Sequence, residues 1–154
     1  MHELSKRRVC LIFVGNNLYD KLNNEKTFMV ERGMGMALDF YQYPKCGTCQ
    51  KAKKWFENNG VEVNEIHIVE NPPSRAKLEE LYEKSGLPLK KFFNTSGKKY
   101  RELGLKDKVN SASEDELLDL LSSDGMLIKR PIVTDGEKVT VGFKEETFDE
   151  TWKR

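Results

Sequence analysis

The chain has 154 residues, of which 38% are hydrophobic, and its 26 basic and 25 acidic residues leave a formal net charge of +1. This composition provides one hydrophobic core and excludes the weakly hydrophobic, highly charged class of disordered chains. The charge balance lacks the cationic excess on which non-specific DNA binding depends, which leaves a local basic face as the alternative, and no apolar run approaches the roughly 18 residues of a membrane span. We therefore expect one globular, monomeric domain that contacts neither DNA nor membrane.

The cysteine content indicates a reducing compartment. Three cysteines cannot form a disulfide scaffold in a chain of this length, and their odd number argues against a secreted framework. Residues 6–14 resemble the basic and apolar parts of a signal peptide, but their apolar run of about six residues is shorter than the usual length of roughly 7–15. We expect a cytoplasmic location, with secretion as the alternative.

Residues 1–36 precede the domain, which spans 37–154. They include a polar tract at 19–26 and show no sustained helical or strand period. We expect this extension to be disordered, or to be leader sequence translated from a start site assigned too far upstream. A functional tail is the alternative.

The first half of the domain predicts a strand, a helix and a second strand. The strand at 38–43 ends at Pro44, and the helix that follows carries its apolar residues on one face. These apolar residues are Cys49, Ala52, Trp55 and Phe56. Asn59-Gly60 predicts the end of the helix, and residues 61–68 alternate between apolar and polar as in a half-buried strand.

The middle of the domain predicts helices. Ser74 is placed to cap a helix that runs to Gly86, and an irregular helical stretch follows at 89–103. Ser113, with a glutamate three residues later, forms a capping box before a leucine-rich helix that ends at Asp124-Gly125.

The last elements predict a hairpin and a terminal helix. Residues 132–134 and 139–141 are β-branched runs joined through Asp135-Gly136, and Phe148 and Trp152 lie four residues apart, as on one face of a helix that packs on the sheet. A strand-helix-strand unit pairs its strands in parallel, and a hairpin adds antiparallel strands. The order predicts an α/β, thioredoxin-like fold: a four-stranded mixed sheet with a helical insertion.

The Cys46-Gly47-Thr48-Cys49 motif stands at a strand-to-helix junction, which favours redox chemistry over zinc binding. A thiol at a helix N-terminus faces unpaired N–H groups and the positive end of the helix dipole, and both favour the thiolate. Cys46 is therefore the expected nucleophile, and Cys49, one turn later, is expected to resolve a mixed disulfide by forming a Cys46–Cys49 bond.

Two alternatives stay open for these cysteines. A zinc site would need further ligands from Cys10, His2 and His67, whereas the simpler interpretation of His67 is a solvent-facing strand histidine. The other alternative is a pair of buried, inert cysteines.

Arg130-Pro131 is the second informative pair. A cis bond before a proline that opens a strand would lay the backbone against the cysteines, and Arg130 would then project toward the sulfurs as a partner for a thiolate or another anion. The alternative is an ordinary edge-strand proline beside a solvated arginine.

Three segments carry a resemblance to a family: Phe40 to Cys49, Arg130 to Val133, and Val141 to Glu145. Together they resemble the glutaredoxin-linked arsenate reductase family, and within it the Spx/MgsR-like branch. The resemblance implies a nucleophilic Cys46, an oxyanion-binding Arg130, supporting roles for Pro131, Thr48 and Lys144, and no bound cofactor or metal. It also implies a reductant such as glutathione, glutaredoxin or thioredoxin.

The chain departs from the reductases at their anion-binding residues. The reductases follow the nucleophile with Gly-x-Ser-Arg, where this chain has Gly47-Thr48-Cys49-Gln50, and the segment 93–97 lacks the arginine they carry there. A third arginine is matched only by Lys144. One clear guanidinium in place of three predicts weak or absent arsenate reduction.

Three classes of function therefore stay open. The first is a thiol-disulfide enzyme that uses a small thiol or a thiol reductant protein. The second is a redox-sensing regulator that binds the RNA polymerase alpha subunit, because the C-x-x-C motif resembles the switch of Spx-type regulators. The third is a structural or binding module in which the cysteines are dispensable.

Overall fold

The computed structural model describes residues 37–153. The predictions for residues 1–36, which include the extension, the signal-like segment, Cys10 and His2, lie outside the described residues. Within residues 37–153, no helix combines the length and apolar composition of a membrane-spanning segment.

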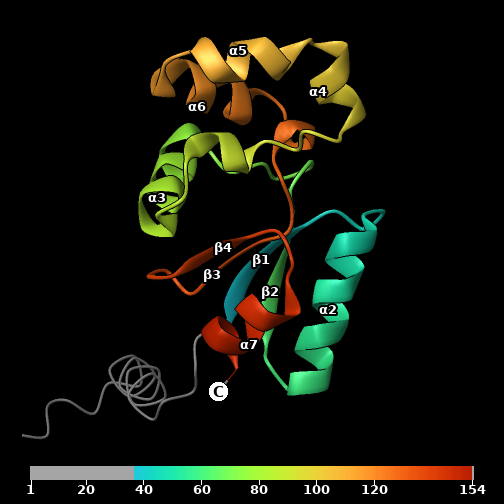
Figure 1. Ribbon diagram of the computed structural model, residues 1–154. Helices are drawn as coiled ribbons and strands as arrows, with labels where there is room; N and C mark the ends of the chain where they lie inside the picture. The colour runs from blue at the N-terminus through green and yellow to red at the C-terminus, as the bar shows by residue number, and fades with distance from the viewer. Residues whose placement is uncertain (1–36, 154) are drawn as a thin grey trace, which may run out of the picture. The chain divides into compact units, whose positions relative to one another are not determined.

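A four-stranded mixed sheet lies at the centre of the domain (Figure 1). The strand order is β2-β1-β3-β4, with β1 (Leu38–Gln42) parallel to β2 (Val63–His67) and antiparallel to β3 (Ile132–Thr134). The hairpin partner β4 (Val139–Val141) pairs antiparallel with β3 at one edge. This arrangement confirms the predicted thioredoxin-like sheet.

Two helices cover one face of the sheet: α2 (Gly47–Asn59), and α7 (Glu145–Trp152) from the end of the chain. Because side chains alternate along a strand, one set of sheet residues points to these helices and packs with their aromatic rings. This core contains Leu38, Phe40, Val133, Trp55, Phe56, Phe148 and Trp152. Phe148 and Trp152 therefore pack on the sheet, as their spacing predicts.

The helical insertion between β2 and β3 covers the other face (Figure 1). Its elements are α3 (Arg75–Ser85), η2 (Leu89–Phe92), α4 (Lys98–Glu102), α5 (Leu105–Ser111), α6 (Glu114–Ser123) and η3 (Gly125–Leu127). Tyr41 and Ile132 of the sheet join the core of the insertion, beside buried leucines from α3 and α6. Because both faces of the sheet are covered, all of β3 and most of β1 are buried.

The predicted helix ends are mostly confirmed. The Ser74 hydroxyl accepts a hydrogen bond from the Lys77 N–H at 3.2 Å, and Ser113 with Glu116 forms a complete capping box at the start of α6. Gly60 ends α2 in the left-handed conformation, with φ of 65°. A residue with a Cβ is strained in that conformation, so the glycine suits this helix end.

Of two predicted glycine turns, the one at Gly125 differs from the expectation, and the hairpin turn through Asp135-Gly136 is confirmed. Gly125 does not end α6 in a left-handed conformation; it begins η3, and a Cβ there would lie 2.1 Å from the Ile68 carbonyl oxygen. The close approach of two backbones, and not helix termination, therefore requires glycine at this position. The hairpin loop spans residues 135–138, and the Asp135 carboxylate accepts hydrogen bonds from the N–H groups of Glu137 and Lys138.

Candidate functional site

Cys46 is the N-cap of α2, at the end of the loop that follows β1. Its N–H donates to the Tyr43 carbonyl at 2.9 Å, and its own carbonyl accepts from the Gln50 N–H at 3.1 Å. The Gln50 side chain also donates to the Pro44 carbonyl at 3.0 Å, which ties the loop to the first turn of the helix. These bonds hold a half-buried Cys46 thiol at the helix N-terminus, as the motif predicts.

The surroundings of Cys46 lower the pKa of its thiol. Burial acts in the opposite direction and is the largest single influence, but several hydrogen bonds together outweigh it. They come from the backbone N–H and the thiol of Cys49, from the Arg130 guanidinium, and from the backbone N–H of Thr48. All of these donors favour the thiolate, because a hydrogen bond to the charged form stabilises that form.

Cys49 lies one turn further along α2 and is only 2% exposed. Burial, reinforced by the neighbouring Cys46, raises the pKa of the Cys49 thiol to about 12, although the Tyr43 N–H acts to lower it. Both cysteines are free thiols in this structure. The pair therefore combines an accessible thiol that ionises readily with a buried thiol that stays protonated.

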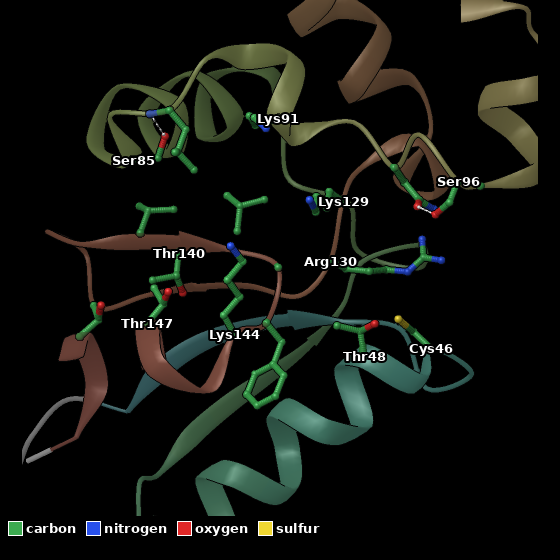
Figure 2. Close-up of a pocket in the computed structure, with 18 residues that line it drawn as sticks. Cys46, Thr48, Ser85, Lys91, Ser96, Lys129, Arg130, Thr140, Lys144 and Thr147 are labelled. Atoms are coloured by element: carbon green, nitrogen blue, oxygen red, sulfur yellow. Dashed lines mark hydrogen bonds between the residues drawn. The ribbon is translucent and has the colours of Figure 1, made fainter. Parts of the chain in front are cut away.

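Arg130 lies opposite the cysteine pair, as expected. It precedes Pro131 through a cis peptide bond, and its guanidinium stands 4.9 Å from the centre of the Tyr43 ring. One terminal N–H group contacts the Met126 sulfur at 3.8 Å, while the buried Nε has no hydrogen-bond partner among the described residues. Figure 2 shows Arg130 and Cys46 at the same end of a cleft. Arg130 thus has donor capacity left for an anion beside the sulfur.

Pro131 is not an edge-strand proline. It is buried and directly precedes β3, which lies between β1 and β4 in the sheet. Its carbonyl accepts a hydrogen bond from the Gly142 N–H at 2.8 Å. Pro131 therefore fixes the start of an interior strand, and its neighbour Arg130 faces the cleft.

His67 is not the solvent-facing strand histidine that the simpler interpretation expected, because most of its side chain is covered. Its side chain is 23% exposed, and its Nδ1 accepts hydrogen bonds from the N–H groups of Val69 and Glu70. The ring also packs edge-on against Tyr43, with centroids 5.6 Å apart. His67 thus supports the aromatic ring on which Arg130 stands. No group of three or more His, Cys, Asp or Glu side chains within residues 37–153 is arranged to hold a metal ion.

The cleft has a volume of about 800 Å³ and a strongly cationic lining. Cys46, Thr48 and Arg130 line it at one end, and Lys144, the N-cap of α7, extends into it (Figure 2). Two further cations that the sequence analysis did not single out, Lys91 and Lys129, complete the set. Within residues 37–153, no aspartate or glutamate lines this cleft.

The two missed lysines carried only a weak signal in the sequence. Lys129 is the immediate neighbour of Arg130, so it could have been suspected, but Lys91 lies in an irregular segment of unknown direction. Only the packing of η2 over the sheet brings it to the cleft. Thr48 contributes its backbone N–H to Cys46, as noted above, and an exposed side chain to the cleft lining.

Comparison with known proteins gives relatives of several kinds. The chain is 72% identical over 117 residues to the protein YusI of Bacillus subtilis, covering 76% of this chain and 99% of YusI. It is 37% identical over 98 residues to an arsenate reductase of Rhizobium meliloti, covering 64% of this chain and 69% of that protein. It is also 29% identical over 110 residues to the regulatory protein MgsR of Bacillus subtilis, covering 71% and 86%.

Among solved structures, a crystal structure from Bacteroides fragilis, described as an ArsC family related protein, superposes with a TM-score of 0.73. Its sequence is 46% identical, and the match covers 75% of this chain and 98% of that chain. The sequence also matches the ArsC family over residues 41–151, a range that holds Cys46, Cys49 and all four cleft cations, Arg130 among them. The chain therefore belongs to the ArsC family.

Proposed function

We propose that this protein is a thiol-disulfide redox protein in which Cys46 is the nucleophile and Cys49 is the resolving thiol. The observation that carries the proposal is the contrast between the two thiols, because the surroundings that lower the pKa of Cys46 coexist with burial that raises the pKa of Cys49. Only a thiolate attacks a disulfide, so this contrast, with the more accessible place of Cys46 at the N-terminus of α2, supports Cys46 as the thiol of the first step.

The reaction balances as follows. The Cys46 thiolate attacks one sulfur of a substrate disulfide, the substrate S–S bond breaks, and the departing thiolate takes up a proton. Cys49 then loses its proton and attacks the Cys46 sulfur, which forms the Cys46–Cys49 disulfide and releases the second substrate thiol. Two electrons and two protons pass from the protein to the substrate.

Arg130 would act in both halves of the cycle, oxidation and re-reduction of the protein, from its place beside Cys46. It donates to the Cys46 thiolate before attack, and the same cation stabilises that thiolate again when it is the leaving group during reduction of the protein disulfide. Glutathione, glutaredoxin or thioredoxin would supply the electrons that restore the dithiol. This cycle needs a reducing compartment, so the proposal includes a cytoplasmic location.

The test uses the reduced full chain and hydroxyethyl disulfide, followed by mass spectrometry of tryptic peptides. We expect an intramolecular Cys46–Cys49 disulfide in the wild type and a stable mixed disulfide at Cys46 in Cys49→Ser. The matched variant Cys46→Ser should form neither product. A mixed disulfide that accumulates at Cys49 in preference to Cys46, or equal reactivity of the two thiols, would contradict the assignment.

A second candidate function is a redox-sensing regulator that binds RNA polymerase. The similarity to the regulatory protein MgsR favours it, and it uses the same disulfide as a switch without turnover. A pull-down of the purified RNA polymerase alpha subunit with the oxidised and the reduced protein separates the two functions. Binding in one redox state only supports the regulator, whereas catalytic turnover of a disulfide without such binding supports the enzyme.

A further inference from the structure

The helical insertion is strongly basic along one stretch. Residues 89–112 contain seven basic and two acidic residues, although the whole chain has a net charge of only +1. The basic residues are Lys90, Lys91, Lys98, Lys99, Arg101, Lys106 and Lys108, and the acidic ones are Glu102 and Asp107. The positive charge of the molecule is therefore concentrated on η2, α4 and α5.

Part of this charge lines a second hollow that adjoins the cleft of Cys46. The second hollow has a volume of about 320 Å³ and shares Lys91 and Lys129 with the cleft. It adds Lys90 and Lys106, and it contains no aspartate or glutamate among the described residues. The two hollows lie on either side of Lys91 and Lys129, one reaching Cys46 and the other α5, and we call the two together the basic groove.

The lysines of the basic groove differ from the cations of α3. On α3, Arg75 contacts Asp115 and Asp119, and Lys77 and Lys84 both contact Glu80. Lys90, Lys91, Lys106 and Lys129 have no carboxylate within salt-bridge distance among residues 37–153. Like charges gathered without counter-charges repel one another, so an anionic partner that enters the groove would relieve this repulsion.

We infer that the basic groove is the docking surface for an acidic polypeptide segment that carries the disulfide to be exchanged at Cys46. The inference rests on the proposed function and adds the class of substrate to it. A small disulfide would occupy only the cleft beside Cys46 and would leave the second hollow empty. A polypeptide that presents its disulfide to Cys46 can lay flanking aspartate or glutamate residues along Lys91, Lys129 and the more distant Lys90 and Lys106.

The chemistry at Cys46 is unchanged by docking. The substrate polypeptide loses its S–S bond and gains two thiols, and the protein gains the Cys46–Cys49 bond, with two electrons and two protons transferred. The groove contributes to the encounter: a cationic surface raises the association rate of an acidic partner by about tenfold or more at low ionic strength. This contribution decreases as salt screens the charges.

The experiment measures the rate at which the reduced full chain reduces three substrates. Two are synthetic peptides of equal length with one internal disulfide, flanked by glutamates in the first and by glutamines in the second; the third is hydroxyethyl disulfide. At low salt we expect the acidic peptide to react about tenfold faster than the neutral peptide. At high salt the two rates should converge.

The variant Lys90→Gln/Lys106→Gln removes charge far from the sulfur. In this variant the rate for the acidic peptide, divided by the rate for hydroxyethyl disulfide, should fall about fivefold. The matched control Lys54→Gln/Lys138→Gln removes two exposed lysines that have no carboxylate partner within residues 37–153 and lie outside both hollows. Its rate ratio should equal that of the wild type.

The outcomes separate this inference from the proposed function. Equal rates for the two peptides, or equal effects of the two double variants, overturn the docking surface and leave the redox function intact. Failure of all three disulfides to react at Cys46 overturns the redox function, and this inference with it. Displacement of the acidic peptide by a tighter-binding single-stranded DNA oligonucleotide would reassign the groove to nucleic acid.

Discussion

Replacement of Arg130 by glutamine should raise the pKa of the Cys46 thiol. A smaller fraction of Cys46 is then thiolate at neutral pH, and its reaction with disulfides shifts to higher pH. Arg130 donates one of the hydrogen bonds that lower the pKa of Cys46. A hydrogen bond to a charged group contributes about 1.5–3 kcal/mol, and partial exposure of both side chains favours the lower value. A loss of about 1.5 kcal/mol corresponds to a roughly tenfold smaller ratio of thiolate to thiol.

The expected change in rate is smaller than the change in thiolate population. A thiolate of higher pKa is intrinsically more nucleophilic, and a Brønsted coefficient of about 0.4–0.5 returns roughly a factor of three. At neutral pH, Arg130→Gln should therefore react with hydroxyethyl disulfide about threefold more slowly than the wild type. At a pH at which Cys46 is fully ionised in both proteins, Arg130→Gln should react faster than the wild type. The two pH profiles should therefore cross.

The assay follows the loss of the dithiol form of the tryptic peptide that holds Cys46 and Cys49, by mass spectrometry, at a series of pH values and constant ionic strength. This readout counts both the mixed disulfide at Cys46 and the Cys46–Cys49 disulfide that Cys49 forms from it, and burial, which raises the pKa of Cys49 to about 12, leaves the first attack to Cys46 in the neutral range. Arg130→Lys, which keeps the charge and lacks the planar fork, should lie between the wild type and Arg130→Gln. Lys45→Gln removes a neighbouring exposed charge and should change the profile less than twofold, because solvent and salt screen an exposed charge.

One result would refute this reasoning: a pH profile for Arg130→Gln that coincides with the wild-type profile while thermal unfolding shows an intact fold. The backbone N–H groups of Thr48 and Cys49, with the Cys49 thiol, would then suffice to stabilise the Cys46 thiolate. The role of Arg130 would be confined to binding an external anion.

Three further predictions concern the cysteine pair, the backbone contact of the insertion, and arsenate. In Cys49→Ser, Cys46 should still attack a disulfide rapidly, but turnover with glutathione as reductant, measured by a coupled assay, should fall more than tenfold, because the intramolecular resolving step is lost. Unchanged turnover would show that the small thiol resolves the mixed disulfide directly. Gly125→Ala should destabilise the fold by about 1–3 kcal/mol or more, because its Cβ would stand 2.1 Å from the Ile68 carbonyl oxygen, whereas Gly47→Ala, with open space around its Cβ, should change the melting temperature little. Arsenate reduction with glutathione and glutaredoxin should be weak or absent, because lysines supply point charges and not the bidentate geometry of arginine; robust arsenate turnover that is lost in Cys46→Ser would contradict this.

The local sequence was sufficient to predict the four strands and most of the helices, although it missed α5. Capping residues such as Ser74 and Ser113 satisfy orphan N–H groups within three residues, so their effect is readable without the fold. The strand-helix-strand order with a following hairpin leaves few topologies, and the four-stranded mixed sheet is one of them. The position of Cys46 at a helix N-terminus likewise follows from its immediate neighbours.

The tertiary structure decided how far apart the two thiols are in pKa and which cations share their cleft. The pKa of Cys49 depends on burial under the sheet, and burial is a property of the packed domain and not of the motif. Lys91 reaches the cleft only because η2 folds back over the sheet, and Gly125 is required by a carbonyl 57 residues earlier in the chain. Such contacts join segments distant in sequence, and no periodicity or local motif encodes a distance of that kind. The sequence by itself determined the fold class and the place of Cys46 at a helix N-terminus, whereas the charge that surrounds the Cys46 sulfur was set by the packing of the helical insertion against the sheet.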